Sequence, residues 1–317
     1  MKVIDILNQS KSTLFSFELL PPLKGHNVQT IFDTIDKLVE FNPAYINITY
    51  HREEVVYRSE QDGSVMPVKV RRRPGTVSLA AAIQFRYGID VVPHIICGGL
   101  DASEIEDALV DLDFLGIQNV LLLRGDADKV IGRFEPKRGG HSHAVDLVRQ
   151  VSNFNKGIYL ENLIEKPKQT DFCIGVAGYP EKHPESPNFE SDIQRLKEKV
   201  DAGASYVVTQ LFFDNSYYFR FVERCREVGI NVPIIPGLKP ISVKDHISLL
   251  PKVFGVQISQ DLVKLVEQCK SNKDVYEVGV EWAINQAKEL KAANVPAIHF
   301  YTMSKSDNIL RIAKAVY

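Results

Sequence analysis

The residue with the clearest chemical potential is Glu18, a carboxylic acid within the apolar, strand-like run from Thr13 to Leu20. Pro21 and Pro22 follow at once, and because two prolines cannot continue a hydrogen-bonded ladder, we expect Glu18 where a strand meets its loop. A buried, unpaired carboxylate is costly, so this side chain should be paired, protonated or in contact with a ligand. A structural salt bridge and an acid catalyst both remain open for Glu18.

Other polar residues also close or follow apolar, β-rich runs along the chain. They are Thr49, Tyr50, His94, Arg124, Gly125, Asp126, Tyr179, Gln210 and Tyr301. If these runs are parallel strands of one barrel, their carboxyl ends meet at one face, where barrel enzymes place their chemistry. His94 taken alone is also typical of a hydrogen-bonded core histidine, so it is the cluster that favours a functional site.

The run from Lys137 to His143 combines basic side chains with Gly139 and Gly140 just before a predicted helix. Such a loop could receive a diphosphate, although a solvated loop would look the same. The chain has neither the glycine fingerprint of a Rossmann site nor a P-loop. The spacing of His141, His143 and His183 fits no common metal motif, so we expect no catalytic metal.

Strand-like and helical patterns alternate from one end of the chain to the other. We expect strands near 13–19, 45–49, 91–95, 119–123, 173–177, 206–210, 232–236 and 297–301. Helical patterns cover 29–41, 77–87, 102–115, 144–154, 190–202, 217–228, 242–291 and 308–316. This order predicts an α/β fold, a (β/α)₈ TIM barrel that forms a single domain over residues 1–317, with a doubly wound open sheet as the alternative.

Local signals refine this prediction. Asp101 to Glu104 and Ser242 to Asp245 have the spacing of helix N-caps, and glycines 116, 203 and 229 stand where helices should end. Long polar loops over 50–75, 125–143 and 179–187 follow predicted strands, and long loops in a compact domain are often functional.

Composition limits the partners of this chain. Its 38 Lys and Arg residues against 40 Asp and Glu residues give a net charge of -2 without a basic stripe, so nucleic acid is not an expected partner. We expect no membrane insertion, because apolar runs are too short. The four scattered cysteines and the absence of a signal-peptide pattern predict reduced thiols and a cytoplasmic location.

Several ordered motifs together resemble the methylenetetrahydrofolate reductase family. The resemblance rests on the segments 16–22, 93–94, 123–126, 177–185, 199–204, 209–214 and 299–302, and it runs from about Leu14 to the C-terminus. It implies the catalytic barrel alone, without the regulatory domain of eukaryotic relatives. It also implies a homo-oligomer that binds FAD and NAD(P)H and reduces 5,10-methylenetetrahydrofolate to 5-methyltetrahydrofolate by a ping-pong mechanism, which feeds one-carbon units to methionine synthesis.

The resemblance assigns roles to individual residues. Glu18 matches the acid that protonates N10 of the folate, and Asp126 matches the carboxylate near the flavin N1 region. FAD contacts are implied for Thr49, Tyr50, His94, Arg124, Gly125, Asp126, His143, Ala144, Tyr179, His183, Ser186, Asp192 and Lys199. Substrate contacts are implied for Glu18, Asp126, Gln210, His246, Tyr301 and Lys305.

Three positions depart from well-known bacterial relatives. Lys305 stands where those relatives have an arginine, and a point charge holds a carboxylate differently from a guanidinium fork. Leu250 and His246 replace an aromatic residue and a glutamine on the helix expected over the flavin. Two other interpretations remain open: a flavin-free barrel lyase or transferase that uses Glu18 and His94 for proton transfer, and a binding module without catalysis.

Overall fold

The computed structural model describes residues 1–127, 132–161, 164–303 and 306–317. Eight parallel strands of this part of the chain close into a barrel in the order β1-β10-β9-β8-β7-β6-β5-β2. They are β1 (Leu14–Leu19), β2 (Tyr45–Ile48), β5 (Val91–Ile96), β6 (Asn119–Leu123), β7 (Cys173–Gly178), β8 (Tyr206–Leu211), β9 (Ile234–Leu238) and β10 (Ala297–Tyr301). The predicted (β/α)₈ barrel is therefore confirmed, and the open sheet is excluded.

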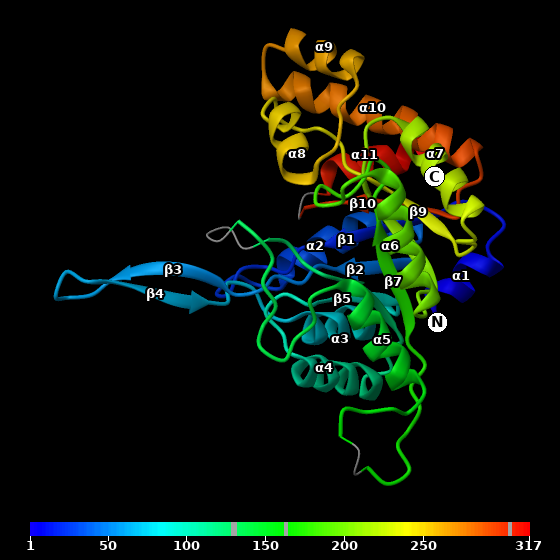
Figure 1. The fold of residues 1–317 in the computed structure, drawn as a ribbon. Helices are drawn as coiled ribbons and strands as arrows, with labels where there is room; N and C mark the ends of the chain where they lie inside the picture. Colours follow the sequence, from blue (N-terminus) through cyan, green and yellow to red (C-terminus); the bar gives the residue numbers. More distant parts are fainter. Residues whose placement is uncertain (128–131, 162–163, 304–305) are drawn as a thin grey trace.

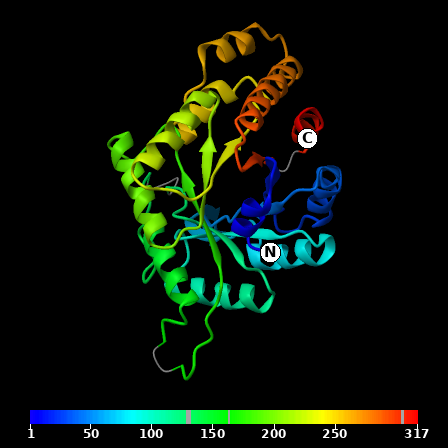
Figure 2. The ribbon, with the colours of Figure 1, turned by 90° about the vertical axis from the view of Figure 1, so that its right-hand side faces the viewer.

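Helices alternate with these strands and surround the barrel (Figures 1 and 2). They are α2 (Gln29–Leu38) with the short 3-10 turn η1 (Val39–Phe41), α3 (Thr76–Tyr87), α4 (Ala102–Phe114), α5 (Ala144–Asn155), α6 (Phe189–Asp201), α7 (Asn215–Glu227) and α11 (Asp307–Val316). The largest apolar cluster lies between the outer face of the strands and the inner faces of these helices. Burial of this cluster is the main force that holds these helices against the barrel.

A helix that we did not predict, α1 (Val3–Gln9), packs against the residues inside the barrel. Its buried Val3 and Leu7 join an apolar cluster with Tyr45 and Tyr206, which face the barrel interior. The backbone N–H of Val3 also donates to Oδ1 of Asn119, the first residue of β6, at 2.8 Å. Since Asn119 begins its strand, α1 covers the amino-terminal end of the barrel, opposite the strand ends that carry the polar cluster.

The predicted helical region 242–291 divides into three helices, α8 (His246–Phe254), α9 (Gln260–Gln268) and α10 (Asn272–Ala292). Their apolar faces form a separate cluster with Leu211, the last residue of β8, and with Phe213 just beyond it. The expected cap at Ser242 is wrong: α8 begins at His246, and the backbone N–H of Ser242 donates to Nδ1 of that histidine at 3.2 Å. The cap at Asp101 is confirmed as a reciprocal capping box with Glu104.

A second missed element is an antiparallel hairpin between β2 and α3. Its strands are β3 (Glu54–Ser59) and β4 (Val65–Val70), which form a sheet of their own. Figure 1 shows this hairpin projecting from the barrel at the level of the strand ends. The sequence interpretation treated residues 50–75 as a polar loop, although Asp62 and Gly63 between two apolar runs are a hairpin signal.

No helix in the described ranges has the length and apolar character that a membrane crossing requires.

Candidate active site

Glu18 lies on β1 between two neighbouring strands whose side chains surround its carboxyl group. Register pairs it with Tyr301 of β10 on one side and with Asn47 of β2 on the other. The residue is only 8% exposed, and its backbone carbonyl accepts a hydrogen bond from Thr302 at 2.7 Å. The carboxyl is therefore held in a buried position at the strand end, as the sequence predicted.

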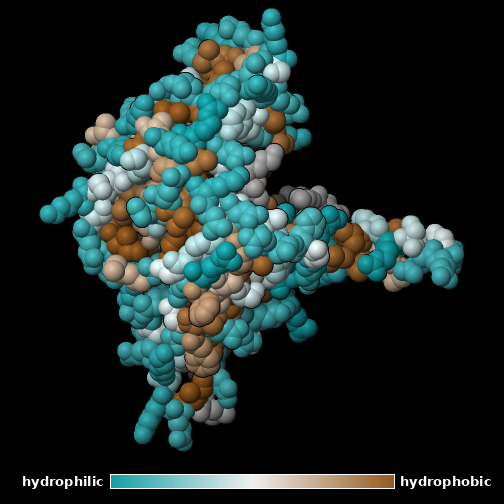
Figure 3. Space-filling model, turned by 180° about the vertical axis from the view of Figure 1, so that it is seen from behind, coloured by the Kyte–Doolittle hydropathy of each residue, from teal (hydrophilic) through white to brown (hydrophobic). Residues whose placement is uncertain are grey.

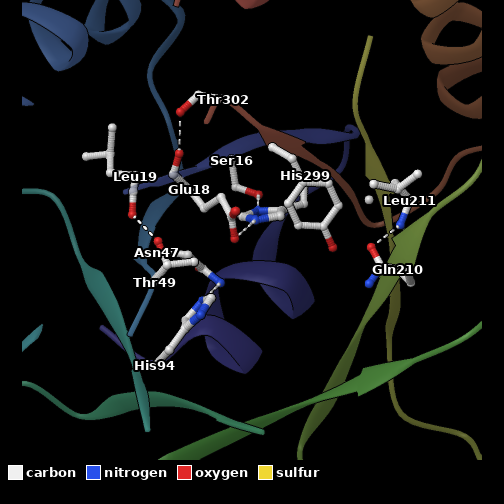
Figure 4. A network of polar contacts seen from close by, with 12 residues as sticks. Ser16, Glu18, Leu19, Asn47, Thr49, His94, Gln210, Leu211, His299 and Thr302 are labelled. Atoms are coloured by element: carbon white, nitrogen blue, oxygen red, sulfur yellow. Dashed lines mark hydrogen bonds and ion pairs between the residues drawn. The ribbon is translucent and has the colours of Figure 1, made fainter. Parts of the chain in front are cut away.

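The nearest titratable partner of Glu18 is His299, which the sequence interpretation did not select. Nε2 of His299 lies 4.0 Å from Oε2 of Glu18, and Nδ1 lies 3.0 Å from the hydroxyl oxygen of Ser16 (Figure 4). His299 is fully buried, and its Nε2 has no hydrogen-bond partner among the described residues. Ser16, Glu18, His299 and Tyr301 all alternate along their strands, and that period of two places them on the inner face.

A second histidine borders the same interior from β5. Nε2 of His94 accepts a hydrogen bond from the amide of Asn47 at 3.2 Å, and both residues are buried. Burial lowers the pKa of His94 to about 4, so its imidazole is neutral at physiological pH. The second amide atom of Asn47, Oδ1, is buried without a partner among the described residues. A neutral ring and a free amide oxygen suit the binding of a polar ligand edge.

Arg124, Gly125 and Asp126 follow β6. The guanidinium of Arg124 makes a bidentate ion pair with Glu185 at 2.6 and 2.7 Å and lies over the ring of Phe134. Gly125 has a φ of +91°, and a Cβ there would lie 3.2 Å from Ile96, so glycine suits this turn. Asp126 is exposed. The turn thus presents one fixed cation and one accessible carboxylate.

A polar network connects the loop after β7 to helix α6. Asp192 accepts hydrogen bonds from the backbone N–H of His183 at 3.0 Å and from the hydroxyl of Ser186 at 2.7 Å. Tyr179 packs edge-on against His183, with ring centres 4.7 Å apart. Lys199 donates to the carbonyl of Ala177 at 2.6 Å, and burial lowers the pKa of its ammonium to about 8. These predicted residues are therefore brought together by one loop and one helix.

The predicted residues on the side of β2 also lie at the strand ends. Thr49 donates its hydroxyl to the carbonyl of Leu19 at 2.8 Å, which joins the ends of β2 and β1. The hydroxyl of Tyr50 accepts from Arg71 at 2.9 Å. His51, which we did not select, is the next residue in the chain. Desolvation lowers its pKa and the charge of Arg73 lowers it further, while the charges of Asp126 and Glu18 act in the opposite direction. His51 therefore lies near both acids of the site.

Two further predicted residues, Gln210 and Tyr301, lie on the strands β8 and β10. Oε1 of Gln210 accepts from the backbone N–H of Leu211 at 2.9 Å (Figure 4). The hydroxyl of Tyr301 donates to the carbonyl of Thr209 at 2.5 Å, and a Cβ on Gly237 would lie 2.6 Å from the Tyr301 ring. The absence of a side chain at Gly237 therefore leaves room for the ring of Tyr301.

Other predicted residues stand at the starts of helices or lie outside the described residues. His143 occupies the N-cap position of α5, and Ala144 is the first residue of that helix. His246 is the first residue of α8, and Leu250 is buried in the apolar cluster of α8 to α10, so Leu250 offers little surface to a ligand. Lys305 lies outside the described residues.

A closed parallel barrel with one buried acid, Glu18, and the buried histidines 94 and 299 toward its carboxyl-terminal mouth defines a (β/α)₈ enzyme class. The family model described as methylenetetrahydrofolate reductase matches residues 2–317. The chain is 30% identical to the 5,10-methylenetetrahydrofolate reductase of Escherichia coli (strain K12), over 96% of this chain and 92% of that protein. The chain therefore belongs to the methylenetetrahydrofolate reductase family.

A plant relative, methylenetetrahydrofolate reductase (NADH) 1 of Arabidopsis thaliana, is 31% identical over 98% of this chain but only 50% of its own length. The chain thus spans about half the length of that relative. Among solved structures, an uncharacterized Clostridium thermocellum protein that binds two copies of 5-methyl-5,6,7,8-tetrahydrofolic acid aligns at a TM-score of 0.58 and 14% identity, over 100% of this chain and 98% of that one. An oxaloacetate acetylhydrolase aligns at a TM-score of 0.52 and 10% identity, over 95% of this chain and 79% of that one. These two likenesses concern the fold.

Proposed function

We propose that this protein reduces 5,10-methylenetetrahydrofolate to 5-methyltetrahydrofolate with FAD and a reduced nicotinamide, NADH or NADPH. The observation that carries the proposal is the buried Glu18 carboxyl at the end of β1, facing His299, in a chain that belongs to this family. Opening the five-membered folate ring requires a proton at N10, and a positioned acid supplies such a proton efficiently. The buried thiols of Cys97, Cys173 and Cys225 are free, which supports a reducing cytoplasm as the place of this reaction.

The groups at the mouth fit FAD. Arg124 and Lys199 provide cations for a diphosphate, and Gly125 lets the backbone approach a ligand. Asn47 has a buried carbonyl oxygen without a partner among the described residues, and His94 is neutral, so both suit a polar heterocycle. We assign FAD contacts to the thirteen residues from Thr49 to Lys199 named above. The chemistry that bound FAD supplies is hydride transfer, in from the nicotinamide and out to the folate.

The chain's own residues complete the folate half-reaction. Glu18 holds the proton and donates it to N10, and His299 stabilises the carboxylate that remains. Asp126 places a negative charge at the mouth, where it favours a developing cation on the folate. Gln210 and Tyr301 orient the folate and the nicotinamide in turn from the β8 and β10 side, and we assign His246 and Lys305 to the outer part of the substrate.

The test separates the two half-reactions. Purified wild-type protein should show flavin absorbance, lose it anaerobically with NADH or NADPH, and regain it with methylenetetrahydrofolate. The Glu18→Gln variant should keep FAD and nicotinamide oxidation while folate reduction falls about 10² to 10⁴-fold. Protein that neither contains nor takes up FAD would exclude the proposed function and favour the flavin-free barrel enzyme. Equal damage to both half-reactions would exclude the acid role of Glu18.

A further inference from the structure

We propose that His51 recharges the acid of the site: it gives Glu18 a proton after each folate reduction and takes its own proton from solvent. This inference rests on the proposed function, because the folate step is the step that uses the Glu18 proton. Glu18 is only 8% exposed, so the carboxylate that is left behind has little direct contact with water. A group that reaches both this carboxylate and solvent shortens the path of the incoming proton.

His51 stands in the loop that leaves β2, beside the end of β1. Register pairs Glu18 with Asn47 of β2. One residue beyond Glu18, the carbonyl of Leu19 accepts hydrogen bonds from the hydroxyl and from the backbone N–H of Thr49, at 2.8 and 3.0 Å. The two strand ends are thus joined at the mouth of the barrel, two residues before His51.

The base of the β3–β4 hairpin holds the far end of the same loop. Figure 3 shows the hairpin projecting into solvent from the body of the protein, so its base is the part that lies against the barrel. At this base Arg72 forms an ion pair with Glu54 at 3.4 Å, and Arg73 donates to the carbonyl of Pro21 in the loop after β1. The loop that carries His51 is therefore held at both of its ends.

Several charged groups surround His51 at the mouth. Desolvation is the main cause that lowers its pKa below the ordinary 6.5, and Arg73 lowers it further. Three carboxylates oppose this shift, and the ring also acts on a second histidine; these neighbours are Asp126, Glu18, Glu54 and His94. An imidazolium whose pKa is lowered is a stronger acid than that of an ordinary histidine, so it gives up its proton readily to a carboxylate.

His51 differs from the two other histidines that act on Glu18. His299 is fully buried, and burial lowers the pKa of His94 to about 4, so neither exchanges protons readily with solvent at neutral pH. The side chain of His51 is exposed. Of these three histidines, His51 is therefore the one that combines contact with water and closeness to the acid.

The transfer balances in protons and charge. The imidazolium of His51 gives one proton to the Glu18 carboxylate through intervening water, and the neutral imidazole then takes one proton from water or from a buffer acid. One proton thus enters from solvent for each proton that N10 of the folate receives. No electrons move in this step.

The test compares a single turnover with repeated turnover in anaerobic stopped-flow experiments. The first folate reduction by pre-reduced protein uses the proton that Glu18 already holds, whereas steady turnover requires recharging each time. At pH 8 in dilute buffer, His51→Gln and His51→Ala should lower the steady rate about tenfold or more and leave the first turnover within about twofold of wild type. Added imidazole should restore the steady rate of His51→Ala, because it carries protons in place of the missing ring.

Two control variants make the result specific. His26 is an exposed histidine in the loop after β1, and His26→Gln should leave both rates unchanged. Imidazole should not rescue Glu18→Gln, because that variant has no acid to recharge.

A wild-type steady rate in His51→Gln overturns the proposal. So does a first turnover that is slowed as much as the steady rate, which would place His51 in the binding of folate or flavin, or a slow steady rate that imidazole leaves unchanged. These results differ from a failure of the proposed function, which wild-type protein without flavin or without folate reduction would reveal and which would overturn both proposals.

Discussion

The Nε2 of His299 faces the Oε2 of Glu18 at 4.0 Å while its Nδ1 lies 3.0 Å from the hydroxyl of Ser16. If the serine hydroxyl donates to Nδ1, the ring carries its proton on Nε2, directed at the carboxyl group. In the proposed reaction, that arrangement stabilises the carboxylate that Glu18 becomes after it gives up a proton, and the buried hydrogen bond fixes the ring. We therefore propose Ser16 and His299 as positioning residues for the acid.

We expect His299→Asn to slow folate reduction about 10 to 100-fold while nicotinamide oxidation stays near the wild-type rate, because only the folate step uses the Glu18 proton. Ser16→Ala should have a smaller effect, about twofold to fivefold, since it removes the orientation of the ring and leaves the ring itself. Anaerobic single-turnover kinetics of each half-reaction over a range of pH provide the measurement. If His299→Asn leaves the folate rate and its pH profile unchanged, the pairing has no catalytic role.

Asp126 should matter to both halves of the cycle. In Asp126→Asn the negative charge at the mouth is lost, so the flavin potential should become more positive and folate reduction should slow by about 10 to 100-fold. Redox titration with a reference dye and stopped-flow kinetics measure the two effects. Asp146→Asn is a control, because this carboxylate lies in the first turn of α5 and pairs with Arg149 on the surface. An unchanged potential in Asp126→Asn would remove the electrostatic role.

The ion pair between Arg124 and Glu185 should set the affinity for FAD. Two short bonds hold the guanidinium in a single orientation, and a cation held in place binds a phosphate or flavin edge at a lower entropic cost. We expect Glu185→Gln to weaken FAD binding several-fold and Arg124→Lys to weaken it about tenfold or more, because lysine has no bidentate fork. Fluorescence titration of the apoprotein with FAD measures the dissociation constant.

The exposed pair of Arg224 and Glu190 provides the control for that experiment, and Glu190→Gln should leave FAD affinity unchanged. Tighter binding in Glu185→Gln would show instead that the carboxylate competes with FAD for Arg124.

The barrel was predictable because its strands are short apolar runs and its helices end at glycines. Gly116 and Gly229, for example, have φ values of +70° and +81° after their helices, where a left-handed residue is required. The β3–β4 hairpin was not predicted, because its apolar residues lie among many charged ones, so composition favoured a loop. Helix α1 was missed because it has only 7 residues, of which two, Val3 and Leu7, are buried, so its pattern is too short to indicate a helix.

The positions of candidate residues were predictable where a polar residue stands at a strand end, as for Glu18 and Arg124. His299 and Asn47 escaped notice because they stand inside their strands, and an apolar run does not show which alternate residues face the barrel interior. The period of two offers the missing signal: Ser16 shares a face with Glu18, and His299 shares one with Tyr301. Contacts between β1 and β10 depend on closure of the barrel, which brings together segments that are far apart in the sequence.

Glu181 gives the protein a pH-dependent stability that is independent of catalysis. Its Oε2 accepts from the backbone N–H of Gln257 at 2.8 Å, while Oε1 is buried with no partner among the described residues. Burial raises the pKa of this carboxyl to about 7. The folded protein therefore holds a proton on Glu181 that the unfolded chain releases near its ordinary pKa of 4.5. The stability that depends on this proton is present below pH 4.5 and is lost as pH rises through about 7.

Glu181→Gln should remove that loss, because an uncharged amide needs no proton. At pH 8 we expect the variant to unfold at a higher urea concentration than the wild type. Its free energy of unfolding should be larger by about 1 to 2 kcal/mol, a figure that allows for solvent screening of a half-buried group. Near pH 5 the two proteins should differ little, since the wild-type carboxyl is then protonated in the fold. Urea unfolding at several pH values measures the difference. A constant gap between the two proteins from pH 5 to 8 would show that Glu181 stays ionised in the folded state.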